Sequence, residues 1–170
     1  MTRENGLAGQ DSRARKLLAY ALWIVLAQLA GVLGSLATAP AIPGWYATLA
    51  KPSWTPPGWL FGPVWITLYA LMGVAAARVW ILHRRSSSGR ASLIVFVVHL
   101  ALNTAWSLLF FGLRAPGLAL VGITVLWATI TVLVVWWWRL ERVAALLLVP
   151  YLGWVSFATA LNAAIWRLNP

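Results

Sequence analysis

Five apolar runs, each about 20 residues long, constrain this chain more than any other feature of its sequence. A run of that length can cross the hydrocarbon core of a bilayer, where only helices and closed barrels satisfy every backbone polar group. Hydrophobic residues make up 62% of the 170 residues and charged ones 9%, too little charge for the surface of a water-soluble domain. We therefore expect an all-α integral membrane protein, a five-transmembrane-helix bundle with spans at about 17–38, 61–82, 91–113, 117–138 and 143–166.

The polar segments between the runs define the layout of the chain. Residues 1–16 form a polar, basic N-terminal tail, and residues 17–170 form the membrane domain, with a first loop at about 39–60. The first run is long for the apolar core of a cleaved signal peptide, so we interpret it as a retained span. The later connections are short, which predicts that successive helices are antiparallel neighbours. One of them, 86–89, has the composition of a flexible linker.

Basic residues lie mostly between the apolar runs, so the net charge of +10 indicates membrane topology rather than nucleic-acid binding. Arg78 lies inside the second run, near enough to its end for its side chain to reach the membrane surface. Trp136, Trp137 and Trp138 are typical of an interfacial tryptophan belt. The basic residues are distributed unequally between the two sides of the membrane, and this predicts a cytoplasmic N-terminus. The distribution does not decide between an inner and an outer membrane. The larger set, on the N-terminal side, is Arg3, Arg13, Arg15, Lys16, Arg84, Arg85, Arg90, Arg139 and Arg142, and the smaller set opposite is Lys51, Arg114 and Arg167.

The first loop is rich in both proline and aromatic residues. Its prolines remove backbone donors and restrict the residues before them, so we expect the stretch from Trp45 to about residue 60 to be non-helical. The helix after it presents a row of large side chains on one face, Trp65, Tyr69 and Met72. A proline-stiffened aromatic loop ahead of an aromatic helix face predicts a lid over a pocket.

Most conventional catalytic groups are missing from the membrane domain. The three acidic residues, Glu4, Asp11 and Glu141, all lie outside the apolar runs, and the chain has no cysteine. Ion-coupled transporters normally hold carboxylates within the membrane, and a Ser-His-Asp triad also needs an acid. Two histidines without such partners make a poor metal site, so we expect no metal.

Polar and aromatic residues inside the runs are more informative. On the third run they follow one helical face, His99, Asn103, Trp106 and Phe110. The fifth run repeats the spacing with Trp154, Ala158, Leu161 and Ile165, beside Asn162. Two interpretations remain open: ordinary bundle packing, with Asn103 and Asn162 as hydrogen bonds between helices, and a shared apolar ligand pocket. For His99 we favour a hydrogen-bonded interior histidine over an axial ligand.

Small residues repeat every four positions along the first run. Ala27, Gly31 and Ser35 form one stripe, and an adjacent stripe contains Ala30, Gly34 and Thr38. Such stripes let helices approach closely, either within the bundle or across a homodimer. The sequence leaves both open.

Three blocks, WYATLAKPSWTPPGWLFGPVWITLYALMG, LALNTAWSLLFFG and PYLGWVSFATALNAAIWRLN, resemble the tryptophan-rich sensory protein or translocator protein family, also called the peripheral-type benzodiazepine receptor family. They occur in the family's order and cover about residues 45–169. The resemblance implies a five-helix fold, often dimeric, that binds tetrapyrroles such as protoporphyrin IX and haem. For animal members of the family, the resemblance also implies binding of cholesterol and synthetic drug ligands. It further implies that the lid closes a pocket among the helices, and that some bacterial members promote light- and oxygen-dependent porphyrin breakdown.

Carried over by motif position, the resemblance places the ligand site at eleven residues. Trp65 and Trp154 match the tryptophans associated with the photochemistry, and they would be catalytic only if the protein is photo-oxidative. The sterol pattern lacks its tyrosine between Asn162 and Arg167, so sterol or drug ligands are expected to bind weakly. The implied ligand-binding residues are Trp45, Trp54, Pro56, Pro57, Trp65, Asn103, Trp106, Phe110, Trp154, Ala158 and Leu161.

Together these observations predict a bacterial membrane receptor or carrier that binds a tetrapyrrole in an aromatic pocket, with a regulatory or stress-related role. Protoporphyrin IX or haem is then a ligand, and no tightly bound cofactor is expected. A light-dependent porphyrin-degrading enzyme is the second interpretation. A structural or assembly partner without a small ligand is the third.

Overall fold

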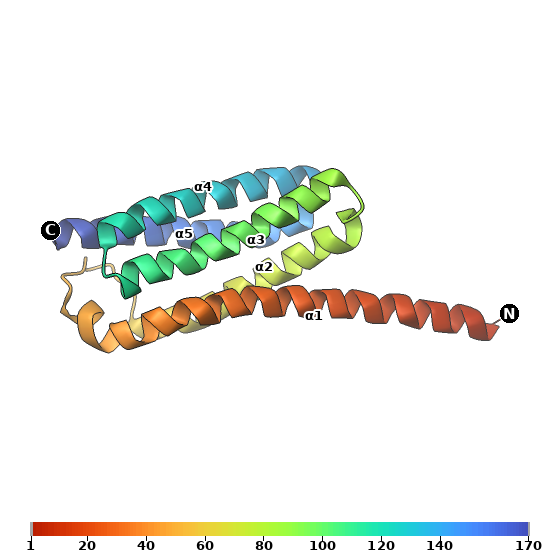
Figure 1. The fold of residues 1–170 in the computed structure, drawn as a ribbon, viewed down its shortest axis with the longest axis horizontal. Coiled ribbons are helices and arrows are strands. Elements are labelled where there is room, and N and C mark those ends of the chain that lie inside the picture. Colours follow the sequence, from red (N-terminus) through yellow and green to blue (C-terminus); the bar gives the residue numbers. More distant parts are fainter. Residues whose placement is uncertain (1, 170) are drawn as a thin grey trace.

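The computed structural model describes the backbone of residues 2–169 and the side chains of residues 13–169. Five long helices form a bundle (Figure 1), and each is long and apolar enough to cross a membrane. The predicted all-α, five-helix, multi-pass membrane fold is therefore confirmed. The helices are α1 (Thr2–Ala41), α2 (Phe61–His83), α3 (Ser87–Ser107), α4 (Pro116–Leu140) and α5 (Arg142–Leu168).

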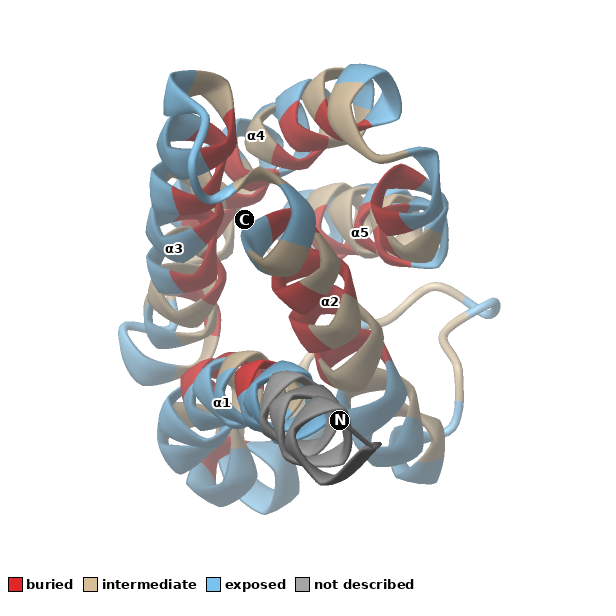
Figure 2. Ribbon diagram, turned by 90° about the vertical axis from the view of Figure 1, so that its right-hand side faces the viewer, coloured by how far each residue is buried: buried red, intermediate tan, exposed pale blue. Residues whose placement is uncertain are grey.

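The helices do not pack simply in chain order. The most extensive pairs, α4 with α5 and α1 with α2, are sequential, but α2 packs more on α5 than on α3, and α1 also packs on α3. The end-on view in Figure 2 shows α2 near the centre of the bundle, with α3, α4 and α5 around it and α1 below it. Buried residues concentrate where α2, α3, α4 and α5 face one another, whereas α1 leaves most of its surface exposed.

One end of the bundle, which we call the basic end, joins α2 to α3 and α4 to α5 (Figure 1). Arg78 does not simply extend to the membrane surface, because its Nε and Nη2 donate to Glu141 Oε1 at 3.1 and 2.8 Å. That carboxylate also caps α5, accepting from the Val143 amide at 3.2 Å. An ion pair thus ties the end of α2 to the α4–α5 junction. The side chains of Arg3, Glu4 and Asp11 lie outside the described residues.

The expected flexible linker at 86–89 is in fact a helix cap. The Ser86 hydroxyl accepts from the Gly89 amide at 3.0 Å, so α3 begins at Ser87. Gly89 is buried against the carbonyl of His83, where a Cβ atom would collide. The segment is ordered because serine is a good N-cap and only glycine fits this contact.

The interpretation of Trp137 as an interfacial anchor is wrong. Its side chain is fully buried, and its ring stacks on Phe96 at a centroid distance of 5.5 Å. Trp138 is exposed, as a belt residue would be, and Arg142 lies 5.9 Å over its ring. Three consecutive tryptophans on a helix point in different directions, so they cannot share one role.

The prediction that the chain is non-helical from Trp45 is also wrong. The last turns of α1 widen into a π-helix at Ile42–Tyr46, and helical backbone continues to Thr48. Pro40 lies inside α1, and local widening lets a membrane helix accommodate the missing donor. A second π-helix, Leu108–Gly112, ends α3 at the same end of the bundle. The two pack through aromatic pairs, with Trp45 and Phe110 at 5.7 Å and Tyr46 and Phe111 at 5.6 Å.

The small residues of α1 are used within the bundle. Ala27 and Ala30 are buried, and a Cβ atom at Gly31 would meet the ring of Tyr69. One at Gly34 would meet Ser107 of α3. Of the two interpretations of these stripes, internal packing is therefore observed.

Candidate ligand cavity

A cavity of about 800 Å³ lies between α1, α2, α3 and α5, at the end of the bundle opposite the basic end. This volume falls within the range of small-molecule sites. Most of the wall is apolar or aromatic. The α1–α2 connection, including the 3₁₀ turn Gly58–Leu60, contributes one side. The aromatic side chains that line the cavity are Tyr46, Trp59, Phe61, Trp65, Tyr69, Trp106, Phe111 and Trp154.

The residues proposed from motif position divide into two groups. One group lines the cavity: Pro56, Trp65, Asn103, Trp106, Trp154 and Ala158. The other group does not line the cavity: Trp45, Trp54, Pro57, Phe110 and Leu161. Trp45 packs on buried Phe110 at 5.7 Å, and Trp54 meets Phe157 edge-on at 5.7 Å.

A directional chain of hydrogen bonds begins at the cavity wall and runs into the core. Tyr69 donates to Asn103 Oδ1 at 2.6 Å, and Asn103 Nδ2 donates to the Tyr151 hydroxyl at 2.7 Å. His99 Nδ1 lies 3.0 Å from the Phe96 carbonyl, which can only accept, so Nδ1 carries the proton. Nε2 is then an acceptor, and Tyr151 donates to it at 3.0 Å. Every polar side-chain atom in this chain of hydrogen bonds has a partner.

This chain settles the alternatives for His99. The side chain is fully buried, both ring nitrogens are hydrogen-bonded, and it does not line the cavity. The prediction of a hydrogen-bonded interior histidine is confirmed. Asn103 fits both interpretations of the polar residues, hydrogen bonding between helices and a ligand pocket. It joins α2, α3 and α5 and also lines the cavity.

Asn162 holds a second wall of the cavity in place. The Trp106 indole donates to Asn162 Oδ1 at 3.1 Å, and Asn162 Nδ2 donates to the Pro116 carbonyl at 2.8 Å. This arrangement links α3, α4 and α5. It also fixes the indole ring of Trp106 against the cavity.

Lys51 is the one charged residue among those that line the cavity. Its Nζ donates to the Leu49 carbonyl at 3.1 Å and lies 4.8 Å from the centre of the Tyr46 ring. Carbonyl oxygens and an aromatic face leave its positive charge uncompensated by any carboxylate within the described part of the chain. The cavity is therefore an apolar chamber with a single cation on its loop side.

The loop that carries Lys51 is fastened to the end of α5. Asn169 Oδ1 accepts from the Ala50 amide at 3.0 Å, and its Nδ2 donates to the Ala50 carbonyl at 2.9 Å. The same Nδ2 also lies 2.8 Å from the Ile165 carbonyl. One side-chain amide thus joins the first loop to a helix 119 residues away.

The groups that line the cavity can contact a small molecule through their rings and polar atoms. Residues 13–169 hold no group of three or more His, Cys, Asp or Glu side chains that could bind a metal. The cavity offers indole faces, hydroxyls, amides and one ammonium group.

Residues 17–167 match the sequence model of the TspO/MBR family. The chain belongs to the TspO/MBR family. The resemblance seen in its three sequence blocks is thereby confirmed.

Relatives within the TspO/MBR family match most of the chain. It is 42% identical to the tryptophan-rich protein TspO of Chlorobaculum tepidum over 92% of this chain and 99% of that protein. It is 38% identical to protein CrtK of Rhodobacter capsulatus over 91% of this chain and 94% of that protein. It is 44% identical to the translocator protein of Homo sapiens over 74% of this chain and 75% of that protein.

Motif reasoning missed the α1 side of this TspO/MBR cavity. Gln28, Gly31, Ser35 and Thr38 all line it, and the Gln28 amide donates to the Ile66 carbonyl of α2 at 3.0 Å. The signal was the small-residue stripe, which explains helix contact as well as it explains a cavity wall. Trp59 was also missed, although it lies in the aromatic loop.

Proposed function

We propose that this TspO/MBR protein is a membrane receptor or carrier that binds a tetrapyrrole in the cavity. One observation carries the proposal: aromatic walls enclose about 800 Å³, and Lys51 is the single charge. These features suit a flat apolar ligand with an acidic edge. Indole faces such as those of Trp65 and Trp154 can stack on a macrocycle, and Lys51 can pair with a carboxylate. We also infer that the basic end faces the cytoplasm, which places the loop on the other side.

Among the usual axial ligands of haem iron the cavity offers only the phenols of Tyr46 and Tyr69, and Tyr69 already donates its proton to Asn103. No histidine, cysteine or methionine lines it, and both nitrogens of His99 are already bonded. Binding then depends on the ring and its carboxylates rather than on the metal. We therefore expect protoporphyrin IX and haem to bind with similar affinity.

The test is a titration of the detergent-purified protein with protoporphyrin IX in the dark, followed by tryptophan fluorescence and by thermal stability. A ligand that binds the native state raises its unfolding temperature. We expect protoporphyrin IX to quench the tryptophan fluorescence saturably and to stabilise the protein. Ala158→Phe, which fills the cavity, should lower the apparent affinity for protoporphyrin IX in both measurements at least tenfold. The exposed Trp138, at the basic end, provides the matched control, because Trp138→Phe leaves the cavity unchanged.

The role of Lys51 can be isolated with the dimethyl ester of protoporphyrin IX, which has no carboxylates. The free acid should bind about tenfold more tightly than the ester to the wild type and equally to Lys51→Gln. Equal affinities in the wild type would refute the carboxylate pairing. Quenching unchanged in Ala158→Phe would refute the cavity as the site. No saturable quenching and no stabilisation of the wild type would favour a structural role without a small ligand.

The same sample tests the second candidate, light-dependent porphyrin breakdown. The observation that favours it is that Trp65 and Trp154 both line the cavity, next to Tyr69 and Phe61 at 5.5 and 5.8 Å. Illumination in air should then give a new absorbing product that Trp65→Phe or Trp154→Phe abolishes. Release of unchanged porphyrin after illumination would support the receptor or carrier alone.

A further inference from the structure

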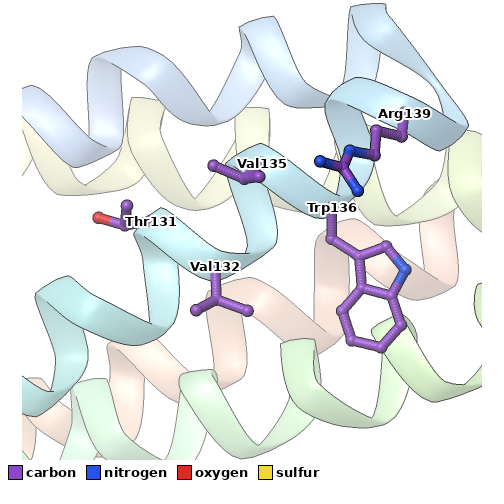
Figure 3. Close-up of a pocket in the computed structure, with 5 residues that line it drawn as sticks. All are labelled: Thr131, Val132, Val135, Trp136 and Arg139. Carbon is purple, nitrogen blue, oxygen red and sulfur yellow. The ribbon is translucent and has the colours of Figure 1, made fainter.

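A second hollow lies on the outer surface of α4 at the basic end, whereas the cavity lies at the opposite end of the bundle. It is a surface groove of about 460 Å³, shown in Figure 3, lined by Thr131, Val132, Val135, Trp136 and Arg139. None of these residues lines the large cavity. The groove is therefore a separate feature.

The groove follows one face of a single helix. Its residues are spaced by one, four, five and eight positions from the first, so they share one side of α4. At 1.5 Å per residue the groove extends about 12 Å, most of the roughly 15 Å depth of one hydrocarbon leaflet. Val132 and Val135 are exposed on this face, and the Thr131 hydroxyl is already bonded to the Trp127 carbonyl at 2.9 Å. The length and the apolar surface suit an acyl chain.

Trp136 forms a rigid wall of the groove. Its indole N–H donates to the Ser88 hydroxyl of α3 at 2.8 Å, which fixes the ring between the two helices. In Figure 3 the ring points away from α4 on the same side as Val132. A tryptophan at this depth lies at the level of lipid headgroups and esters.

Arg139 closes the groove at its polar end. The guanidinium extends back along the helix toward Val135 (Figure 3), and residues 13–169 provide it with no hydrogen-bond or ion-pair partner. The one acid in that range, Glu141, is engaged by Arg78 and the Val143 amide. Arg139 is thus an uncompensated cation at the end of an apolar slot.

We propose that this groove binds one acidic phospholipid of the leaflet at the basic end. An acyl chain lies along Val132 and Val135, and the phosphate pairs with the Arg139 guanidinium. A guanidinium binds phosphate oxygens in a bidentate manner, and the low dielectric at the membrane boundary strengthens the pair. Charge complementarity selects an anionic headgroup over a zwitterionic one, whose own ammonium group compensates its phosphate.

The test measures thermal unfolding of the full chain in a neutral detergent, with added dioleoyl phosphatidylglycerol or dioleoyl phosphatidylcholine. We expect phosphatidylglycerol to stabilise the wild type at concentrations at least tenfold lower than phosphatidylcholine does. Arg139→Gln should remove this preference. Val135→Trp should also remove it, because it fills the slot while keeping the charge.

Arg85→Gln is the matched control, since Arg85 is an exposed cation at the same end that does not line the groove. It should keep the preference within about twofold. Equal loss in Arg85→Gln and Arg139→Gln would overturn the proposal in favour of diffuse surface charge. Equal stabilisation by inorganic phosphate would overturn it in favour of a free-anion site, and an unchanged preference in Val135→Trp would exclude the slot.

Discussion

Tyr151→Phe removes one oxygen from the centre of the hydrogen-bond chain, and the structure predicts its cost. The hydroxyl accepts from Asn103 and donates to His99, so its loss leaves a buried donor and a buried acceptor without partners. Hydrogen bonds between membrane helices contribute about 0.6 kcal/mol on average and at most about 1.7 kcal/mol each. Two of them give an expected loss of about 1–3 kcal/mol in the free energy of unfolding.

Tyr69→Phe is the matched control because Tyr69 makes one bond in the chain, as a donor to Asn103. It should cost about half as much as Tyr151→Phe. Unfolding in mixed micelles with increasing anionic detergent, followed by circular dichroism, measures both. Adding His99→Leu to Tyr151→Phe should cost less than the sum of the single changes, since the unpaired acceptor is then absent. Equal costs for the two tyrosines, or full additivity, would refute the two hydrogen bonds assigned to Tyr151.

Three other changes test separate features. Arg114 has a positive φ of 53°, so Arg114→Gly should raise the free energy of unfolding by about 1 kcal/mol, measured by the same unfolding assay. Gly73→Ala should lower it by about 1–3 kcal/mol because the new Cβ meets the Ile24 backbone, whereas Gly153→Ala, with open space around it, should be neutral or stabilising. Asn169→Ala removes two hydrogen bonds to the backbone of Ala50. On the proposed function, this change should speed porphyrin release about tenfold, measured by stopped-flow fluorescence. An unchanged release rate would show that this contact does not hold the loop closed.

The sequence was sufficient for the number and approximate position of the spans because bilayer thickness imposes one length on every apolar run. It was insufficient at the ends of helices. The first span was predicted to end at about residue 38, yet α1 includes Pro40 and the helical backbone continues through a π-helix to Thr48. Widening a turn is a local adjustment to neighbouring rings, here Phe110 and Phe111, and no residue pattern in α1 encodes those neighbours.

The candidate site was predictable only where a residue's role depends on its own chemistry. Indoles and amides within apolar runs indicated a pocket, and Trp65, Asn103, Trp106 and Trp154 do line one. Trp45 carries the same indole, but it packs on Phe110 and does not line the cavity. Which side of a ring faces empty space depends on the positions of the helices, and a single sequence does not contain those positions.

The cavity itself follows from how α1 lies against α2. Toward the basic end, Gly73 brings the α2 backbone against the backbone of Ile24, so the two helices touch without a gap. Further along, Tyr69 occupies the space over Gly31, and Trp65 stacks on Tyr69 at 5.5 Å. The Tyr69 ring therefore packs into the space that Gly31 leaves on α1, and both residues also line the cavity. The ring that would contact a ligand therefore also packs α2 against α1, so replacing Tyr69 by a small residue should change the spacing of α1 and α2 as well as the affinity for the ligand.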